Sequence, residues 1–286
     1  MSAAITQKAE KYALQCMEIW GGNHAVDTAV SVTGIDAWVV SQPYAGSETG
    51  GDIHYLSMCG HGRLSRFTVA DVSGHGGEVG ELASTLRKLM WKNINTLDQT
   101  QFVRKLNQEF SHLGQAGKFA TALLASYYAP TDHLIVCNAG HLPPLWYQAG
   151  TQTWKFLKHD ISDRLDNITN LPLGIIEPTD YYQFAVRLEK DDLILIYTDS
   201  LIEAQSVSGE QLGQGGLLKL VNQLDVSNTG RLCHLLVDVI AQYRNGAPAD
   251  DDLTVLLLHH NAADPPQQSI GDMLRVMGKM MGLVKV

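Results

Sequence analysis

The sequence predicts a single α+β domain in which antiparallel sheets are covered by helices. Short apolar strands alternate with tight turns, a pattern typical of hairpins and therefore of antiparallel pairing. Two segments with helical spacing of their apolar residues come as a pair, and not singly after each strand as in a βαβ fold. The predicted hairpins join residues 52–58 to 64–72 and 119–128 to 133–138, and the paired helices span residues 77–95 and 100–113.

The composition of the chain narrows the classes of function. Hydrophobic residues make up 45% of the 286 residues, enough for a substantial core. The net charge is -9, from 30 acidic and 21 basic residues, and the sequence has no dense Lys/Arg cluster. Binding to nucleic acid or to an anionic membrane is therefore not expected as the main function.

Cysteine usage and hydropathy indicate a cytoplasmic protein. The four cysteines are scattered and include no C-x-x-C pair. We therefore expect free, mostly buried thiols and neither disulfides nor structural zinc. No apolar run approaches the roughly 18 residues that a membrane-spanning helix requires, and the N-terminus lacks the long apolar stretch of a signal peptide.

The two ends of the chain are predicted to be additions to the domain. Apolar side chains within residues 2–20 fall on one side of a helix, which Gly21 and Gly22 would end. Residues 1–35 are therefore assigned to an N-terminal helical extension that covers a sheet or pairs with another protomer. Residues 261–286 are predicted to form a Met-rich amphipathic tail that binds a partner or docks on the chain itself.

Residues 36–260 make up the predicted domain. Residues 158–174 are polar and irregular, and we expect them to form a lid or an edge loop. The remaining predicted elements are strands at residues 37–41, 181–188, 193–198 and 253–259, a strand that begins at Leu145, and helices at residues 215–224 and 229–243.

Four aspartates lie at the borders of predicted strands. Asp52 opens a strand, and Asp71 and Asp199 each end one. Asp251 stands just before the last strand. Each acid taken singly is typical of a turn or a helix cap. A carboxylate beside an apolar strand is costly unless it is paired or bound to a cation. Together the four indicate oxygen ligands gathered at one end of a sheet, and Mg²⁺ or Mn²⁺ suits such ligands.

Two divalent ions at such a site could hydrolyse a phosphate without a nucleophilic side chain. Ions roughly 3.5 to 4 Å apart hold a shared water, lower its pKa and aim it in line at phosphorus. The glycines on either side of His75 allow the sharp turn that a metal or phosphate site needs. The sequence contains no phosphatase Cys-x5-Arg loop, no G-x-S-x-G elbow and no G-x-x-x-x-G-K-[ST] loop.

Seven short motifs follow one another along the chain. They are Gly50-Gly51-Asp52, Ala70-Asp71-Val-Ser-Gly-His-Gly76, Phe119-Ala-Thr-Ala122, Asn138-Ala-Gly-His141 with Pro143-Pro144, Leu173-Gly174, Tyr197-Thr-Asp199 and Asp251-Asp-Leu-Thr254. Together they resemble the metal-dependent PPM (protein phosphatase 2C-like) phosphatases of the bacterial SpoIIE-type branch. The resemblance covers about residues 36–260. It implies a four-layer α-β-β-α sandwich, two Mn²⁺ or Mg²⁺ ions, and hydrolysis of phosphoserine or phosphothreonine on a protein by a metal-bridging water.

The resemblance also assigns roles to individual residues. Asp52 matches the acid that bridges both metals. Asp71, Asp199 and Asp251 match the acids that complete the shell, and the backbone carbonyl of Val72 matches a further ligand.

The chain departs from the family at the proposed proton donor. Many members carry a histidine two residues after the second aspartate, where this chain has Ser73. His75 is the candidate donor here and joins Asp52 and Asp71 in the predicted catalytic set; the alternative is a structural turn histidine. The phosphate-binding arginine of eukaryotic members has no counterpart in this sequence.

Several further polar residues lie in or near the motifs. We expect Asn138 and His141 to hydrogen-bond their loop to its neighbours. Asp250 and Asp252 are expected to be solvated or capping residues, with metal binding through water as the alternative for Asp252. The histidines near the predicted mouth of the site are His54 and His61.

The resemblance predicts a bacterial phosphatase of partner-switching signalling. Its substrate would be a small phosphorylated regulator, such as a STAS-type anti-sigma-factor antagonist, and a separate sensor or activator protein would control it. Residues 78–95 and 100–113 match the paired helices that act as a switch in related proteins. These helices, or the N-terminal one, would form a homodimer contact. Two alternatives remain open: a docking module of the same fold, and a hydrolase of small phosphate compounds.

Overall fold

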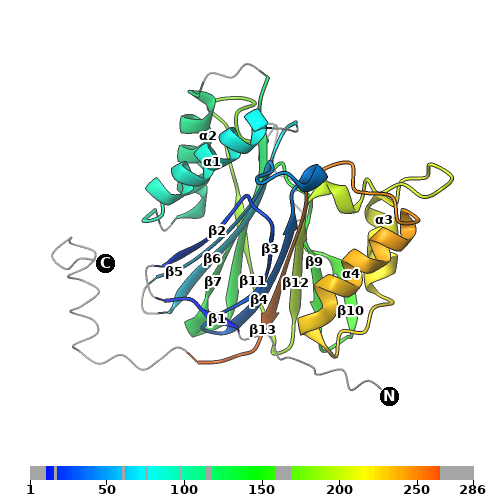
Figure 1. Ribbon diagram of the computed structural model, residues 1–286. Helices are drawn as coiled ribbons and strands as arrows, with labels where there is room; N and C mark the ends of the chain where they lie inside the picture. The colour runs from blue at the N-terminus through cyan, green and yellow to red at the C-terminus, as the bar shows by residue number, and fades with distance from the viewer. Residues whose placement is uncertain are drawn as a thin grey trace.

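Two β-sheets lie face to face, and a pair of helices covers the outer face of each (Figure 1). The computed structural model describes residues 11–15, 18–59, 62–74, 77–96, 98–113, 117–158 and 169–264. The arrangement confirms the predicted α+β class and the four-layer α-β-β-α sandwich. Helices α1 (Gly77–Lys92) and α2 (Gln99–Ser111) pack on one sheet, and α3 (Gly213–Val221) and α4 (Thr229–Tyr243) pack on the other.

The sheet beneath α1 and α2 has the strand order β11-β8-β7-β6-β5-β2, and its neighbouring strands pair antiparallel. In its β5–β6 hairpin, Asp52 lies directly opposite Asp71. The register therefore brings two of the predicted ligands together. The strands are β2 (Ile19–Gly22), β5 (Asp52–Cys59), β6 (Leu64–Val72), β7 (Ala120–Tyr128), β8 (His133–Ala139) and β11 (Gln183–Arg187).

The second sheet has the strand order β1-β3-β4-β13-β12-β9-β10. Its pairs are antiparallel except for the short parallel pair β1–β3. Because β12 and β13 are antiparallel neighbours, the end of β12 lies beside the start of β13. The strands are β1 (Tyr12–Ala13), β3 (Val26–Val32), β4 (Ile35–Gln42), β9 (Leu145–Gln148), β10 (Thr153–Phe156), β12 (Leu193–Tyr197) and β13 (Leu253–His260). The 3₁₀ helices are η1 (Tyr44–Gly46), η2 (Ala129–Thr131) and η3 (Asp199–Leu201).

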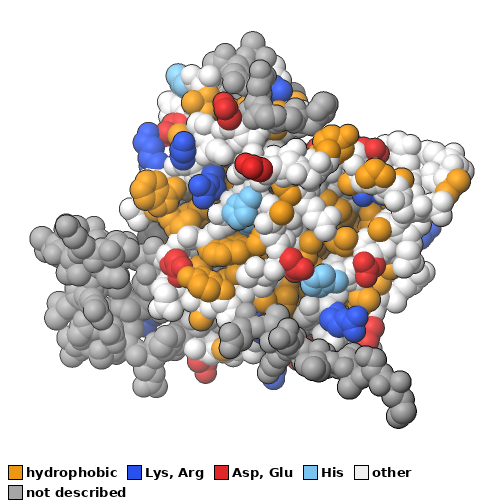
Figure 2. All heavy atoms as spheres, viewed as in Figure 1, with side chains coloured by type: hydrophobic (Ala, Val, Ile, Leu, Met, Phe, Trp, Pro, Cys, Tyr) orange, Lys and Arg blue, Asp and Glu red, His pale blue; other side chains and the backbone are white. Residues whose placement is uncertain are grey.

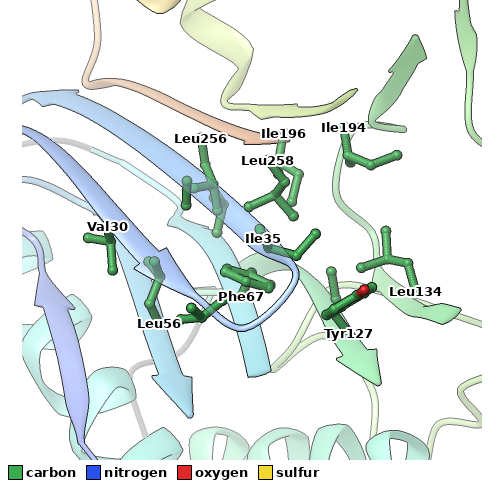
Figure 3. Packing of buried hydrophobic residues seen from close by; sticks show 14 of the residues in the cluster. Val30, Ile35, Leu56, Phe67, Tyr127, Leu134, Ile194, Ile196, Leu256 and Leu258 are labelled. Atoms are coloured by element: carbon green, nitrogen blue, oxygen red, sulfur yellow. The ribbon is translucent and has the colours of Figure 1, made fainter. Parts of the chain in front are cut away.

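The central core lies between the two sheets. Leu56 and Phe67 from one sheet and Ile196 and Leu256 from the other are fully buried in it (Figure 3). Side chains alternate between the faces of a strand, so Tyr55, next to Leu56, joins the core under α1 and α2 instead. Burying one such side chain contributes about 1.5–3 kcal/mol, which is why the two sheets stay stacked.

Each helix pair buries one apolar face on its sheet. Leu82 and Leu86 of α1 contribute to the core over β5 and β6, and Leu236 and Ile240 of α4 contribute to the core on the second sheet. Figure 2 shows one side of the molecule, where hydrophobic side chains gather over the region between the sheets. No helix in the described part of the chain is long and apolar enough to cross a membrane.

The N-terminal part of the chain corrects the prediction of a helix over residues 2–20. Within that range the structure has the strand β1 and the start of the strand β2. The strand β3 also precedes the first strand expected from the sequence. β2 pairs with β5 and β3 pairs with β4, so partners elsewhere in the chain override the local helical spacing. Residues 1–10 and 16–17 lie outside the described residues.

The structure also bears on the expectations for the lid, the strand at Leu145 and the cysteines. The predicted lid is fixed at its end, because Leu173 pairs with Ala120 at the start of β7. The strand expected at Leu145 is the first half of a hairpin with β10, which the sequence did not predict. Cys137 and Cys233 are buried free thiols, as expected. The Met-rich tail from residue 265, most of the lid (159–168), His61 and His75 lie outside the described residues.

Candidate active site

Two predicted ligands form a pair on neighbouring strands. β5 begins at Asp52, and β6 carries Asp71 directly opposite. Asp52 is only 3% exposed. Burial raises the pKa of Asp52 well above its ordinary value, and the charge of Asp71 raises it further. The buried pair is costly without a compensating positive charge.

The other two predicted ligands come from the second sheet. Asp199 begins the η3 turn two residues after the end of β12, and Asp251 lies two residues before β13. Burial raises the pKa of Asp199 to about 6, and the charges of Glu203 and Asp251 act in the same direction. Burial likewise raises the pKa of Asp71 to about 7, with Asp199 and Asp251 as the strongest charged contributors. The structure thus brings the four aspartates from both sheets to one end of the sandwich.

The donor set fits cations that keep part of their water. The main influences on the pKa of Asp71 are burial and the charges of four other acids, and all of them raise it. Such excess negative charge suits divalent cations. Among the described residues, no three acidic, histidine or cysteine side chains converge closely enough to enclose one ion. Mg²⁺-type ions often use one or two carboxylates and several waters, so such an ion does not require three protein side chains around it.

Asp252 holds the glycine loop that leads into Asp52. Its Oδ2 accepts a hydrogen bond from the Gly51 amide at 2.5 Å, and its Oδ1 accepts one from the Tyr44 amide at 2.6 Å. A Cβ atom at Gly50 would lie 2.4 Å from Asp252 Oδ1, so this close approach requires glycine. Of the two roles considered for Asp252, the structure supports capping.

Asn23 ties the same loop to α1. Its side-chain amide donates hydrogen bonds of 3.0 Å to the carbonyls of Gly50 and Gly80. The backbone carbonyl of Asn23 accepts a hydrogen bond of 2.8 Å from the Gly50 amide. Asn23 is buried in the turn between β2 and β3. One side chain therefore connects that turn, the loop before Asp52 and the helix α1.

His141 links the two sheets, as its expected structural role requires. Its Nδ1 lies 2.8 Å from the Thr121 hydroxyl, and its Nε2 lies 3.1 Å from the Tyr197 carbonyl. Thr121 stands opposite Asp71 in the β6–β7 pair. The side-chain carbonyl of Asn138 accepts a hydrogen bond of 2.7 Å from the backbone N–H of His141, and its side-chain NH₂ donates one of 2.9 Å to the backbone carbonyl of His141. The Asn138–His141 loop is thereby fixed next to the acids.

Ser73 and His54, two polar residues near the motifs, have structural roles. The Ser73 hydroxyl accepts a hydrogen bond of 3.1 Å from the Phe119 amide, so Ser73 joins two segments of backbone. His54 is fully buried in the sandwich and packs beside Trp20, with ring centroids 5.4 Å apart. Burial lowers the pKa of His54 to about 3. His54 is therefore a neutral core residue and not a residue at the mouth of the site.

Sequence reasoning missed three residues around these acids. Glu203 follows Asp199 by one helical turn and raises its pKa, a spacing visible in the sequence. The hydroxyls of Thr198 and Thr254 act on Asp52. Both threonines stand inside quoted motifs, but only the structure places them against an acid of the other sheet.

Comparisons relate the chain to known proteins. The family model described as Stage II sporulation protein E (SpoIIE) matches residues 61–261. Phosphoserine phosphatase RsbU of Bacillus subtilis (strain 168) is 26% identical over 191 residues, which cover 66% of this chain and 54% of RsbU. The chain thus spans about half the length of this curated relative.

Solved structures share the fold. The RsbU and RsbW domains of a Mycobacterium tuberculosis protein superpose with a TM-score of 0.69 and 23% identity, over 91% of this chain and 70% of that one. The PP2C phosphatase domain of Bacillus subtilis SpoIIE, with a fragment of its regulatory domain, gives a TM-score of 0.65 at 16% identity, over 85% and 71% of the two chains. Since the family model spans well over half of the sequence and the fold agrees, this chain belongs to the family of Stage II sporulation protein E (SpoIIE).

Proposed function

We propose that the chain is a metal-dependent phosphatase that hydrolyses phosphoserine or phosphothreonine on a regulatory protein. The observation that carries this proposal is the cluster of Asp52, Asp71, Asp199 and Asp251, in which burial, and after it the charges of the other acids, raise the pKa of Asp71 to about 7. A cluster of this kind is stable and useful when cations occupy it. Membership of the SpoIIE family supports the same reading.

In this proposal the acids hold two Mn²⁺ or Mg²⁺ ions. Asp52 would bridge both ions, Asp71, Asp199 and Asp251 would complete their shells, and the Val72 carbonyl would add one ligand. Bound ions of this type supply an activated water and offset the charge of the phosphoryl group. The catalytic domain of the serine/threonine phosphatase PstP, which shares the fold at a TM-score of 0.54 and 15% identity, is described in complex with two manganese ions.

The chain's own residues orient the ions and the substrate in this scheme. Asp252 and Asn23 keep the loop before Asp52 in place, and His141 keeps the two sheets in register. His75 as the proton donor stays part of the proposal. The Lys118 ammonium lies 3.4 Å from the carbonyl of Ser73, two residues beyond Asp71.

The proposed substrate is a phosphorylated STAS-type antagonist in the cytoplasm, with a separate activator protein and a homodimer as further parts of the proposal. The similarity to a phosphoserine phosphatase, RsbU, favours a phosphoprotein substrate over small phosphate compounds. Comparing hydrolysis of a phosphoserine protein with hydrolysis of nucleotides and sugar phosphates tests this preference directly.

Mn²⁺-dependent hydrolysis of p-nitrophenyl phosphate tests the site. Asp71→Asn and Asp199→Asn should each lower activity at least about 100-fold, since loss of outer-shell partners alone costs 10- to 100-fold. Asp225→Asn is the matched control, because Asp225 is exposed and, within the described residues, hydrogen-bonds only to Ser227. Equal activity of all three variants would contradict the assigned ligands, and wild-type protein that neither binds Mn²⁺ nor hydrolyses any phosphoprotein would favour a docking module.

A further inference from the structure

Three hydroxyl side chains form a row across adjacent strands of the second sheet. Ser41 on β4 is paired with Thr254 on β13. Thr198, just after β12, donates its backbone N–H to the Thr254 carbonyl at 3.1 Å. The three residues are 0 to 3% exposed. Buried hydroxyls in the middle of an apolar sheet are costly unless each finds a partner.

The hydrogen bonds of the row have a fixed direction. The Thr254 amide donates to Thr198 Oγ1 at 2.9 Å, so that oxygen serves as an acceptor there. The single proton of the Thr198 hydroxyl is then free to point to Asp52 Oδ2 at 2.8 Å. Its other possible acceptor, the Thr254 carbonyl, is farther away at 3.5 Å. The hydroxyls of Ser41 and Thr254 are 2.9 Å apart and complete the row.

The row reaches across the sandwich. Asp52 belongs to β5 of the sheet under α1 and α2, whereas the three hydroxyls belong to the other sheet. The bond from the Thr198 hydroxyl therefore crosses from one sheet to the other. A hydroxyl that donates to a carboxylate favours its charged form, which is the form that binds a cation.

A hydroxyl suits this task better than a charged donor. Lysine or arginine at position 198 would also favour the carboxylate, but its positive charge would compete with a metal ion for the same oxygens. A neutral hydroxyl occupies one carboxylate oxygen and adds no charge. With Oδ2 oriented by Thr198, the rotation of the Asp52 carboxylate is fixed before any cation arrives.

We propose that Thr198 is a positioning residue that orients the Asp52 carboxylate from the opposite sheet, and that the backbone N–H of Thr254 orients the Thr198 hydroxyl in turn. The inference rests on the proposed function, because it assigns the oriented carboxylate to a bound metal ion. It predicts that a hydroxyl group at position 198, and not the bulk of the side chain, sets the affinity for the cation.

Calorimetric titration with Mn²⁺ tests this assignment without relying on catalysis. Thr198→Val keeps the shape and removes the hydroxyl, so its Mn²⁺ affinity should fall about 10- to 100-fold. Thr198→Ser keeps the hydroxyl and should bind within a few-fold of wild type. Thr68→Val is the matched control: Thr68 is buried on β6, and its hydroxyl has no hydrogen-bond partner within the described residues. Its Mn²⁺ affinity should stay unchanged.

Thermal unfolding in EDTA checks that each variant is folded. If Thr198→Val does not fold, Thr198→Ala against Thr198→Ser provides the same comparison, because these two variants differ by the hydroxyl alone. Equal Mn²⁺ affinity of wild type and the valine variant overturns the inference and leaves the proposed function standing. Equal weakening by serine and valine also overturns it, because keeping the hydroxyl would then not preserve the affinity. Wild-type protein that binds no Mn²⁺ overturns both.

Discussion

His141 is a buried histidine whose two ring nitrogens bond to opposite sheets. Burial lowers its pKa to about 4. A histidine in the unfolded chain has a pKa of about 6.5. Between these values the unfolded state holds one proton more than the folded state. The contribution of His141 to stability is therefore complete above about pH 6.5 and declines as the pH falls toward 4.

A pH series measures this contribution. We expect wild type to lose about 1.4 kcal/mol more than His141→Gln between pH 8 and pH 5.5, from urea unfolding at each pH. The variant is the control for every other titrating group, because it keeps them all. Stability curves that run parallel with pH would show that His141 is not held neutral in the fold.

The individual acids were easier to predict than their partners. A carboxylate at the border of an apolar strand is conspicuous in a sequence, so Asp52, Asp71 and Asp199 were named from position alone. A threonine inside a strand is not, because Thr198 and Thr254 also satisfy the ordinary preference of β-branched residues for strands. Their contact with Asp52 depends on how two sheets stack, which no local pattern encodes.

Among the elements, the loop before β5 is the most constrained part of the site. Gly50→Ala would place a Cβ atom 2.4 Å from Asp252 Oδ1, and that carboxylate is already held by two backbone amides. Making room requires breaking at least one of these bonds. We expect a loss of about 1–3 kcal/mol in the free energy of unfolding, measured by urea denaturation.

Gly150→Ala provides the comparison for that loss. A Cβ atom at Gly150 would meet no heavy atom within 4 Å, so its effect should stay within about 0.5 kcal/mol. If the two variants have equal stability, the loop before β5 yields more easily than its contacts indicate. Mn²⁺ affinity should fall with Gly50→Ala alone, because Asp52 follows the same loop.

The elements themselves were predicted where local pattern and sheet partner agree. Residues 52–58 and 64–72 alternate, turn and pair with each other, and they appear as β5 and β6. The helix predicted for the N-terminal segment is wrong because there the local pattern and the sheet partner disagree. Its apolar spacing fits a helix, but β2 gains its hydrogen bonds from β5, more than thirty residues away. β-structure depends on such distant partners, and a helix does not.

At the scale of the whole molecule, the four acids are a source of instability that cations should remove. Burial raises the pKa of Asp71 to about 7, and the charges of Asp199 and Asp251 act in the same direction, so the acids repel one another across the two sheets. At pH 8 in EDTA, Asp71→Asn should therefore melt at a higher temperature than wild type, because one buried charge is gone. Scanning calorimetry of the two proteins measures the difference.

Addition of Mn²⁺ should reverse that order. Binding stabilises the folded state by about 2.7 kcal/mol when the free ion is at 100 times its dissociation constant. Wild type should gain this stability, and Asp71→Asn should gain much less. A variant that melts below wild type in EDTA would mean that the acids do not repel one another in the folded protein.

The buried side chain of Asn23 links the turn between β2 and β3 to the loop before Asp52 and to α1. Its amide group holds the carbonyls of Gly50 and Gly80 at the same time, each at 3.0 Å. A rigid-body shift of α1 must either break the bond to Gly80 or pull the loop before Asp52 along with it. Contacts made on the surface of α1 are thus coupled to the Asp52 carboxylate through the side-chain amide of Asn23.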